Sequence, residues 1–240
     1  MKAIVLAAGK GTRLAGLTKN IPKPMLPIKG KPLLEHIISY LNNNGIIEIG
    51  INLFTMPEQI IDYFGNGSRF KVKIEYSRED ELLGTAGSLL YFSDWLKGED
   101  FLVIYGDILT NQPLAPMIEM HRDKHAFATL LLHRRQASNS YIALDQYSKI
   151  IEFIERPGEH EMERLKQLHP EGFLVNSAVQ IINNIALNYI ETHKCFDLPR
   201  DVYCKVLKEK DLYGYVLEGE RMAIDSPERY EQACHADFIK

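Results

Sequence analysis

The chain has 240 residues, with 28 Lys and Arg against 32 Asp and Glu, which gives a formal net charge of −4. Its apolar fraction of 45% and charged fraction of 25% are those of an ordinary folded domain and exclude a mainly disordered, collagen-like or coiled-coil chain. The acidic balance argues against a nucleic-acid partner, which needs a basic excess or a basic face. No apolar run approaches the roughly 20 residues of a membrane span, so we expect no membrane partner.

Cysteine usage and the first residues both favour a cytoplasmic protein. Cys195, Cys204 and Cys234 form no CxxC pair and are odd in number, which is typical of a reducing compartment. The apolar stretch after Met1 and Lys2 is brief and meets a glycine loop, unlike a signal peptide.

Predicted strands and helices alternate through the first 105 residues. From apolar runs and helical spacing we expect strands at residues 2–8, 46–54, 71–77 and 101–105, and helices at 32–44, 57–64 and 85–96. This order predicts an α/β fold with a mostly parallel central sheet and helices on both faces.

The pattern changes beyond about residue 110. We expect a helix at residues 113–124, a strand at 127–133 and an antiparallel pair at 141–144 and 150–155, with further segments completing the chain. The antiparallel pair predicts a smaller antiparallel portion beside the parallel sheet. No linker rich in Gly, Ser or Pro divides the chain, so residues 1–240 are predicted to form a single domain.

A glycine-rich loop follows the first strand. Glycines at 9 and 11 allow backbone N–H groups to approach an anion closely. The loop is neither a P-loop nor a dinucleotide fingerprint, because Leu14 stands where the third glycine belongs. Lys23 lies between two prolines that stiffen its backbone, and a fixed lysine near an anion cradle is a phosphate-binding device. The competing interpretations are a plain tight turn and a solvated loop lysine.

Asp107 comes directly after the predicted buried strand at residues 101–105. Open α/β sheets place their ligand sites at the carboxyl ends of such strands. The competing interpretation is a turn or capping aspartate after Gly106.

These motifs resemble the signature of the sugar-1-phosphate nucleotidyltransferases, and within that family they are most similar to short bacterial mannose- and heptose-1-phosphate guanylyltransferases. The resemblance spans nearly the whole chain in order. It is carried by LAAGKGTRL (6–14), LT (17–18), PKPMLP (22–27), GKPLL (30–34), LGTAG (83–87), YGD (105–107), FIERP (153–157), Asn176 and PERY (227–230).

The resemblance implies an enzyme of the EC 2.7.7 type with a Rossmann-like nucleotidyltransferase fold. A nucleoside triphosphate and a sugar 1-phosphate would give a nucleotide sugar and pyrophosphate, with Mg²⁺ as cofactor. Residues 1–110 would bind the nucleotide and residues 111–240 the sugar phosphate. Because the sugar phosphate attacks the α-phosphorus in line, the protein would mainly position groups and neutralise charge. A homodimer is compatible with the resemblance.

The resemblance also assigns the nucleotide side of the site. Arg13 would bind the β,γ-phosphates, Lys23 would neutralise charge near the α-phosphate, and Asp107 would be a metal ligand. The remaining nucleotide-binding residues would be Ala7, Ala8, Gly9, Gly11, Thr12, Glu79, Gly84 and Thr85.

Glu79 stands where family members place a Gln or Glu that recognises the base. A carboxylate can accept from the N1–H and amino groups of guanine, whereas uracil or thymine offers one N–H between two carbonyls. The sequence therefore favours GTP. The competing interpretation is a solvated acidic loop formed by Glu79, Asp80 and Glu81.

The sugar-phosphate side would contain Glu155, Arg156 and Asn176, and it departs from the family in several places. Arginine replaces the family's lysine at 156, and both are cations suited to phosphate. Ser177-Ala178 follows Asn176 where a glycine is common, and Asn139-Ser140 stands where Tyr-Gly is common. The identity of the sugar is therefore not assigned.

The largest departure lies near the C-terminus. The family pattern Asp-Ile-Gly-Thr-Pro supplies a second metal ligand, but this chain has Ala223-Ile224-Asp225-Ser226-Pro227. Residues two apart on a strand face the same side, so Asp225 is expected to replace the usual ligand. The competing interpretation is that Asp225 or Ser226 caps the helix that follows.

This departure keeps two other functions open. Some family cytidylyltransferases carry Met-Asp-Thr, which aligns with residues 224–226, so the chain could act with CTP on a sugar phosphate or another small phosphate. A non-catalytic nucleotide-binding homologue is the third hypothesis, suggested by Ala223 and Ala178.

Overall fold

Strand β1 (Lys2–Leu6) is an inner strand of the parallel part of the sheet in the computed structural model. It runs parallel to β4 (Glu48–Leu53) on one side and β6 (Phe101–Tyr105) on the other, and β5 (Lys73–Arg78) extends the parallel set beyond β4. These strands end at one edge of the sheet, the edge where parallel α/β sheets bind ligands. The structure describes residues 1–14, 16–136, 138–192 and 194–239.

The remainder of the sheet is mostly antiparallel. β11 (Phe173–Ile182) pairs antiparallel with β6, β8 (Ala128–Arg135) and β9 (Ser140–Leu144). β10 (Ile150–Glu155) pairs antiparallel with β9, and β12 (Leu212–Val216) runs parallel to β8. The sheet thus combines four parallel strands, β6, β1, β4 and β5, with the antiparallel portion that the sequence predicted.

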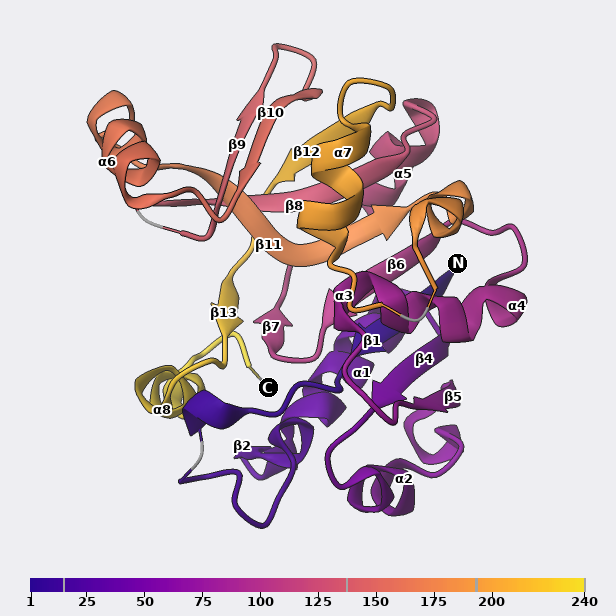
Figure 1. Ribbon diagram of the computed structural model, residues 1–240. Helices are drawn as coiled ribbons and strands as arrows, with labels where there is room; N and C mark the ends of the chain where they lie inside the picture. The colour runs from indigo at the N-terminus through magenta and orange to yellow at the C-terminus, as the bar shows by residue number, and fades with distance from the viewer. Residues whose placement is uncertain (15, 137, 193, 240) are drawn as a thin grey trace.

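Helices cover both faces of the sheet (Figure 1), because successive residues of a strand point to opposite sides. Ala3 of β1 packs in one core with the apolar sides of α1 (Leu33–Asn43) and α2 (Pro57–Phe64). The next residue, Ile4, packs on the opposite side against residues 84–96. The predicted α/β class is therefore confirmed.

The remaining elements are short. They are β2 (Pro27–Ile28), β3 (Lys31–Pro32), β7 (Ile108–Thr110), β13 (Arg221–Ala223), α5 (Ala115–Asp123), α6 (Glu159–Leu168), α7 (Cys204–Val206) and α8 (Pro227–His235). In the part of the chain that the structure describes, none of the helices combines the length and the apolar character needed to cross a bilayer.

The single helix predicted at residues 85–96 is wrong. In its place the structure has α3 (Gly84–Gly87), a 3-10 turn (Ser88–Phe92) and α4 (Ser93–Leu96). Gly87 lowers the helix propensity of this stretch, and the first turn is tied to a distant segment, because the amide of Ala86 donates to Phe196 O at 2.7 Å. The apolar spacing predicted which side chains are buried but not the backbone that buries them.

A two-stranded ribbon brings the C-terminal part of the chain to the ligand-binding edge. β13 pairs antiparallel with β7, and the amide of Ile224 donates to Asp107 O at 2.8 Å. Residues 221–225 consequently lie beside the carboxyl end of β6, more than a hundred positions away in the sequence.

Candidate active site

Three connected cavities follow the carboxyl edge of the parallel strands. The central cavity is about 320 Å³, the glycine-loop cavity about 180 Å³ and the β11 cavity about 220 Å³. Lys23 and Asp107 line both of the first two, and Thr85 and Tyr105 line both the central and the β11 cavities.

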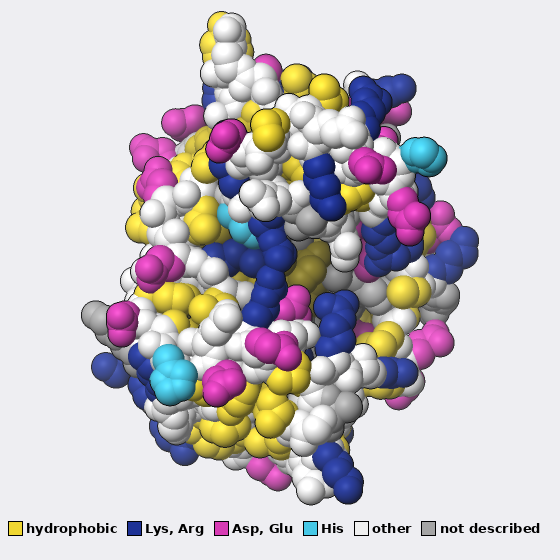
Figure 2. Space-filling view, turned by 90° about the vertical axis from the view of Figure 1, so that its left-hand side faces the viewer, with side chains coloured by type: hydrophobic (Ala, Val, Ile, Leu, Met, Phe, Trp, Pro, Cys, Tyr) yellow, Lys and Arg dark blue, Asp and Glu magenta, His cyan; other side chains and the backbone are white. Residues whose placement is uncertain are grey.

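Every site residue predicted from the sequence lines one of these cavities. The central cavity has Ala7, Ala8, Gly9, Lys23, Glu79, Gly84, Thr85 and Asp107. The glycine-loop cavity adds Gly11, Thr12, Arg13 and Asp225, and the β11 cavity adds Glu155, Arg156 and Asn176. On the face formed by β13 and α8, Figure 2 shows Lys and Arg side chains gathered in a central hollow beside Asp and Glu side chains.

The glycine loop is held against the segment that carries Lys23. Gly11 has φ of +64°, and a Cβ there would lie 3.2 Å from Cβ of Lys23 and 3.3 Å from Cγ2 of Thr18. Thr18 Oγ1 donates to the carbonyl oxygens of Gly11 (3.3 Å) and Leu14 (3.1 Å). Glycine is the residue that accepts both this backbone conformation and this close approach.

Lys23 and Asp107 form an ion pair between the central and glycine-loop cavities. Lys23 Nζ lies 2.7 Å from Asp107 Oδ2, and the two side chains are 14% and 28% exposed. Lys23 begins a 3-10 turn directly after Pro22, and its two flanking prolines restrict the backbone there. The Lys23 side chain is only 14% exposed, which is inconsistent with its interpretation as a solvated loop lysine.

Asp225 also lines the glycine-loop cavity, between two arginines. Its Oδ1 is 3.0 Å from Arg229 Nη1, and its Oδ2 is 3.8 Å from Arg13 Nη1. The helix cap is formed by its neighbour, because Ser226 Oγ accepts from the amide of Arg229 at 3.3 Å. Ala223 is buried opposite Ile108 and offers no ligand atom.

The two carboxylates of the glycine-loop cavity fit a metal that arrives with a triphosphate. Among the described residues, no three His, Cys, Asp or Glu side chains gather closely enough to hold a metal by themselves. Mg²⁺ is commonly bound by one or two carboxylates together with substrate phosphates and water. Asp107 and Asp225 supply that donor set, and their present partners are cations that a metal would displace or repel.

Glu79 is a buried carboxylate in the lining of the central cavity. It is 6% exposed, its Oε1 accepts from Asn52 Nδ2 at 2.7 Å, and its Oε2 accepts from the amide of Leu83 at 3.3 Å. Asp80 and Glu81 are exposed, so Glu79 alone of the three acidic residues faces inward. This geometry excludes the interpretation of Glu79 as part of a solvated acidic loop.

Asn52 is a site residue that sequence analysis missed. It lies near the carboxyl end of β4, where its Oδ1 accepts from the amide of Ala7 at 2.7 Å and its Nδ2 donates to Glu79. It thereby joins the end of β1 to the inward-facing carboxylate. The available signal was one polar residue within the apolar run of residues 49–53.

Hydrogen bonds hold residues 83–87 against residues 196–198. The amide of Phe196 donates to Leu83 O at 2.9 Å, and the amide of Leu198 donates to Thr85 Oγ1 at 2.9 Å. Asp197 Oδ1 accepts from the amide of Thr85 at 3.3 Å. Asp197 also lines the β11 cavity, so one segment shapes both the central and the β11 cavities; sequence analysis had assigned it no role.

The β11 cavity is polar. Arg156 Nη2 lies 3.4 Å from Asp197 Oδ2, and burial raises the pKa of Glu155 from 4.5 to about 7. Asn176 belongs to a bulge of β11, where its Oδ1 accepts from the amide of Ala178 at 2.8 Å. Ala178 has φ of +61°, the left-handed conformation that glycine adopts most easily. The missing glycine has therefore not prevented this backbone turn.

The raised pKa of Glu155 predicts a pH-dependent stability. Because the folded state holds the proton more tightly than the unfolded state, wild-type stability falls as pH rises from about 4.5 to 7. Glu155→Gln removes the buried charge. We expect this variant to match wild type near pH 4.5 and to be more stable above pH 7 by about 2 kcal/mol, which is the full value of about 3 kcal/mol for the pKa difference reduced for partial solvent exposure.

Urea unfolding at both pH values measures this difference. Glu163→Gln, an exposed position on α6, is the matched control and should follow the wild-type curve. A difference between wild type and Glu155→Gln that does not change with pH would contradict the assignment of a buried, titrating carboxyl.

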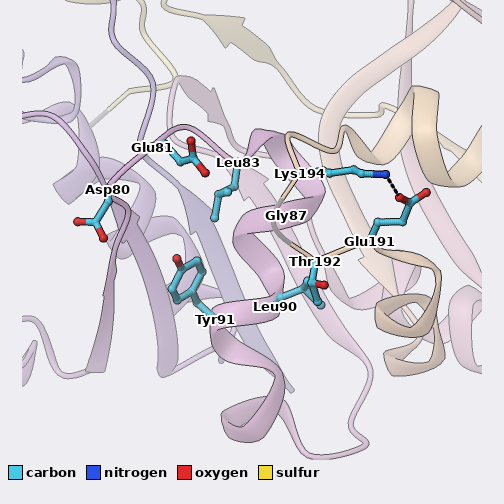
Figure 3. A pocket seen from close by; sticks show the side chains of 9 residues that line it. All are labelled: Asp80, Glu81, Leu83, Gly87, Leu90, Tyr91, Glu191, Thr192 and Lys194. Carbon is cyan, nitrogen blue, oxygen red and sulfur yellow. Dashed lines mark hydrogen bonds and ion pairs between the residues drawn. The ribbon is translucent and has the colours of Figure 1, made fainter.

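A further cavity lies between side chains of residues 80–91 and those of Glu191, Thr192 and Lys194 (Figure 3). Its volume is about 550 Å³, and it contains none of the predicted site residues. Asp80, Glu81 and Glu191 line it together with Lys194, which is ion-paired to Glu191. A cavity with this acidic excess does not suit a phosphate group.

Comparisons with known sequences agree on one family. The family model described as Nucleotidyl transferase matches residues 2–220. The D-glycero-alpha-D-manno-heptose 1-phosphate guanylyltransferase of Aneurinibacillus thermoaerophilus is 32% identical over 97% of this chain and 96% of its own length.

Other relatives are longer than this chain. The UTP--glucose-1-phosphate uridylyltransferase of Synechocystis sp. is 33% identical over 86% of this chain, which spans 55% of that protein. The mannose-1-phosphate guanylyltransferase of Mycobacterium tuberculosis is 28% identical over 99% of this chain, which spans 64% of that protein.

Solved structures share the fold. HddC from Yersinia pseudotuberculosis, complexed with GMP-PN, superposes with a TM-score of 0.79 at 24% identity over 98% of both chains. UDP-glucose pyrophosphorylase complexed with UDP-glucose superposes with a TM-score of 0.81 at 21% identity, covering 99% of this chain and 98% of that one.

Proposed function

Since this chain belongs to the nucleotidyl transferase family, we propose that it transfers a nucleotidyl group from GTP to a sugar 1-phosphate of the mannose or heptose type. The observation that carries the proposal is the order of the three cavities. The central cavity adjoins the other two and contains the buried carboxylate of Glu79 together with Lys23 and Asp107. The glycine-loop cavity adds Arg13 and Asp225 on one side, and polar side chains line the β11 cavity on the other.

The reaction follows from this order. An oxygen of the sugar phosphate attacks the α-phosphorus of the nucleotide, the bond from that phosphorus to the bridging oxygen of the β-phosphate breaks, and pyrophosphate leaves. No protein nucleophile is needed, so the residues act by position and charge. Backbone N–H groups at residues 9–12 cradle the triphosphate, Arg13 holds its leaving end and Lys23 neutralises the α-phosphate.

Asp107 and Asp225 would hold Mg²⁺. When bound, this ion would neutralise charge on the triphosphate oxygens. The carboxylates also orient the cations around them, because Asp107 pairs with Lys23 and Asp225 pairs with Arg229. These pairs keep the cations in place before the substrates enter.

The contacts of Glu79 support GTP. Each carboxylate oxygen can accept two hydrogen bonds, and each oxygen of Glu79 accepts one within the protein. The remaining capacity matches the adjacent N1–H and amino groups of guanine. Two guanylyltransferase relatives match 99% and 97% of this chain, whereas the uridylyltransferase relative matches 86% of it.

The lining of the β11 cavity supports a sugar. Hydroxyl, amide and carboxylate groups of Ser140, Asn139, Asn176, Glu155 and Asp197 match the alternating donors and acceptors of a polyol. Tyr105 is the one aromatic side chain among the described lining residues. A quaternary ammonium acceptor would require a cage of aromatic rings, so a choline-like phosphate is disfavoured.

Pyrophosphate release tests the proposal. GTP, CTP, UTP, dTTP and ATP are crossed with mannose, heptose, glucose and N-acetylglucosamine 1-phosphates in the presence of Mg²⁺. We expect release with GTP and with the mannose or heptose compound. Release with CTP or UTP in its place would overturn the base assignment, and silence across all pairs would overturn the transfer activity.

A further inference from the structure

Arg221 lies beside residues of both the glycine-loop and the β11 cavities. It begins β13 and pairs with Thr110 of β7, the strand that follows Asp107. Its Nε donates to Ser177 O at 3.1 Å. Ser177 lies between Asn176 and Ala178, which both line the β11 cavity. The guanidinium therefore lies near Asp107 and Asp225 of the glycine-loop cavity and contacts the strand that lines the β11 cavity.

The charges around Arg221 are divided between two arginines and two aspartates. Arg135 and Arg229 face it together with Asp107 and Asp225, and burial lowers the pKa of Arg221 to about 10, so it remains a cation at neutral pH. Arg229 is paired with Asp225 and Lys23 with Asp107. In the described chain, Arg221 has no carboxylate partner of its own. A half-buried guanidinium without such a partner is unfavourable unless an anion joins it.

A neutral histidine supports the same position. His133 is hydrogen-bonded through Nδ1 to Ser177 Oγ at 2.8 Å. Burial, followed by the charges of Arg221, Arg135 and Arg229, lowers the pKa of His133 to about 4. His133 thus holds Ser177, the residue on which Arg221 rests, without adding another charge.

We infer that Arg221 binds the phosphate group of the acceptor and holds its attacking oxygen toward the α-phosphorus. This inference rests on the proposed function, and it assigns the acceptor phosphate a second cation beside Arg156. In the proposed function Arg13 takes the leaving phosphates and Lys23 the α-phosphate, whereas the acceptor phosphate comes from the β11 cavity, which Asn176 and Ala178 line on either side of Ser177. A planar guanidinium can donate two parallel hydrogen bonds to such a phosphate.

Steady-state kinetics with Arg221→Gln test the inference. We expect the KM for the sugar 1-phosphate to rise about 10- to 100-fold, as for loss of a charged hydrogen bond, and the KM for the nucleotide to stay within about twofold. Arg221→Lys should recover part of the lost acceptor binding, since lysine keeps the positive charge but cannot donate two parallel hydrogen bonds from a planar group. Arg164→Gln, exposed on α6, is the control and should behave as wild type.

A binding measurement separates this inference from the proposed function. Titration calorimetry with inorganic phosphate, without nucleotide, should show binding weakened about tenfold or more in Arg221→Gln but not in Arg164→Gln. Wild-type turnover with an unchanged acceptor KM in Arg221→Gln would overturn the inference and leave the function standing. An inactive wild type whose phosphate binding depends on Arg221 would overturn the function and leave the anion site. Circular dichroism of each variant shows whether it is folded.

Discussion

Asp107→Asn is expected to lower the rate of pyrophosphate release by about a thousandfold. The substitution keeps the shape of the side chain but removes the charge that pairs with Lys23 at 2.7 Å and that would hold Mg²⁺. Removal of one preorganised electrostatic group from a polar active site costs about 10²–10³ in rate. The folded state should persist, because the side chain is partly exposed at 28% and the volume is unchanged.

Comparison of kcat with the melting temperature separates these two effects. Asp123→Asn, exposed on α5, is the matched control and should retain wild-type turnover. Turnover by Asp107→Asn within about tenfold of wild type would show that this carboxylate is not central to the chemistry.

Gly84→Ala is expected to destabilise the protein by about 3 kcal/mol. Gly84 has φ of +76°, and a Cβ there would lie 2.5 Å from Phe196 O. The left-handed conformation costs an alanine about 1–2 kcal/mol, and the collision adds a cost of about 1–3 kcal/mol from overpacking. Phe196 would have to move, which would open the contact between residues 83–87 and 196–198 and weaken nucleotide binding.

The chain offers a close control for this substitution. Gly98 has φ of +77°, but nothing lies within 4 Å of a Cβ built there. Gly98→Ala should therefore lose only the stability that the left-handed backbone conformation costs, about 1–2 kcal/mol, and should bind nucleotide normally. Urea unfolding and nucleotide titration compare the two. Equal losses of stability would contradict the close packing of Gly84 on Phe196.

The parallel strands and the loops that follow them were predictable because both depend on nearby residues. An apolar run followed by Gly9 or by Gly106-Asp107 indicates a buried strand and its carboxyl end without knowledge of the rest of the fold. Lys23 was predictable for the same reason, since its neighbouring prolines restrict the backbone locally. The resemblance to a family then supplied roles that no local pattern contains.

The residues missed by sequence analysis act over long separations. Asn52 contacts the amide of Ala7 across 45 positions, and Asp197 contacts Thr85 across 112. Arg221 reaches the site only because β13 pairs with β7. None of these contacts leaves a periodic trace in the sequence. The prediction of one helix at 85–96 is wrong for a related reason, because the first turn of this segment is hydrogen-bonded to the distant residue Phe196.

The C-terminal departure shows how packing decides between local alternatives. Sequence left a capping role open for either Asp225 or Ser226. The structure gives the cap to Ser226 and leaves the Asp225 carboxylate in the glycine-loop cavity, which Asp107 also lines. We therefore propose Asp225, not the position of Ala223, as the partner of Asp107.

The central claim is that the acceptor's phosphate oxygen attacks the α-phosphorus of the nucleotide. Its most direct test uses the most active sugar 1-phosphate with its three terminal phosphate oxygens replaced by ¹⁸O, followed by mass spectrometry of both products. The account predicts that the nucleotide sugar retains all of the ¹⁸O and that the released pyrophosphate contains none. Label in the pyrophosphate, or a nucleoside monophosphate formed with oxygen from water, would contradict it.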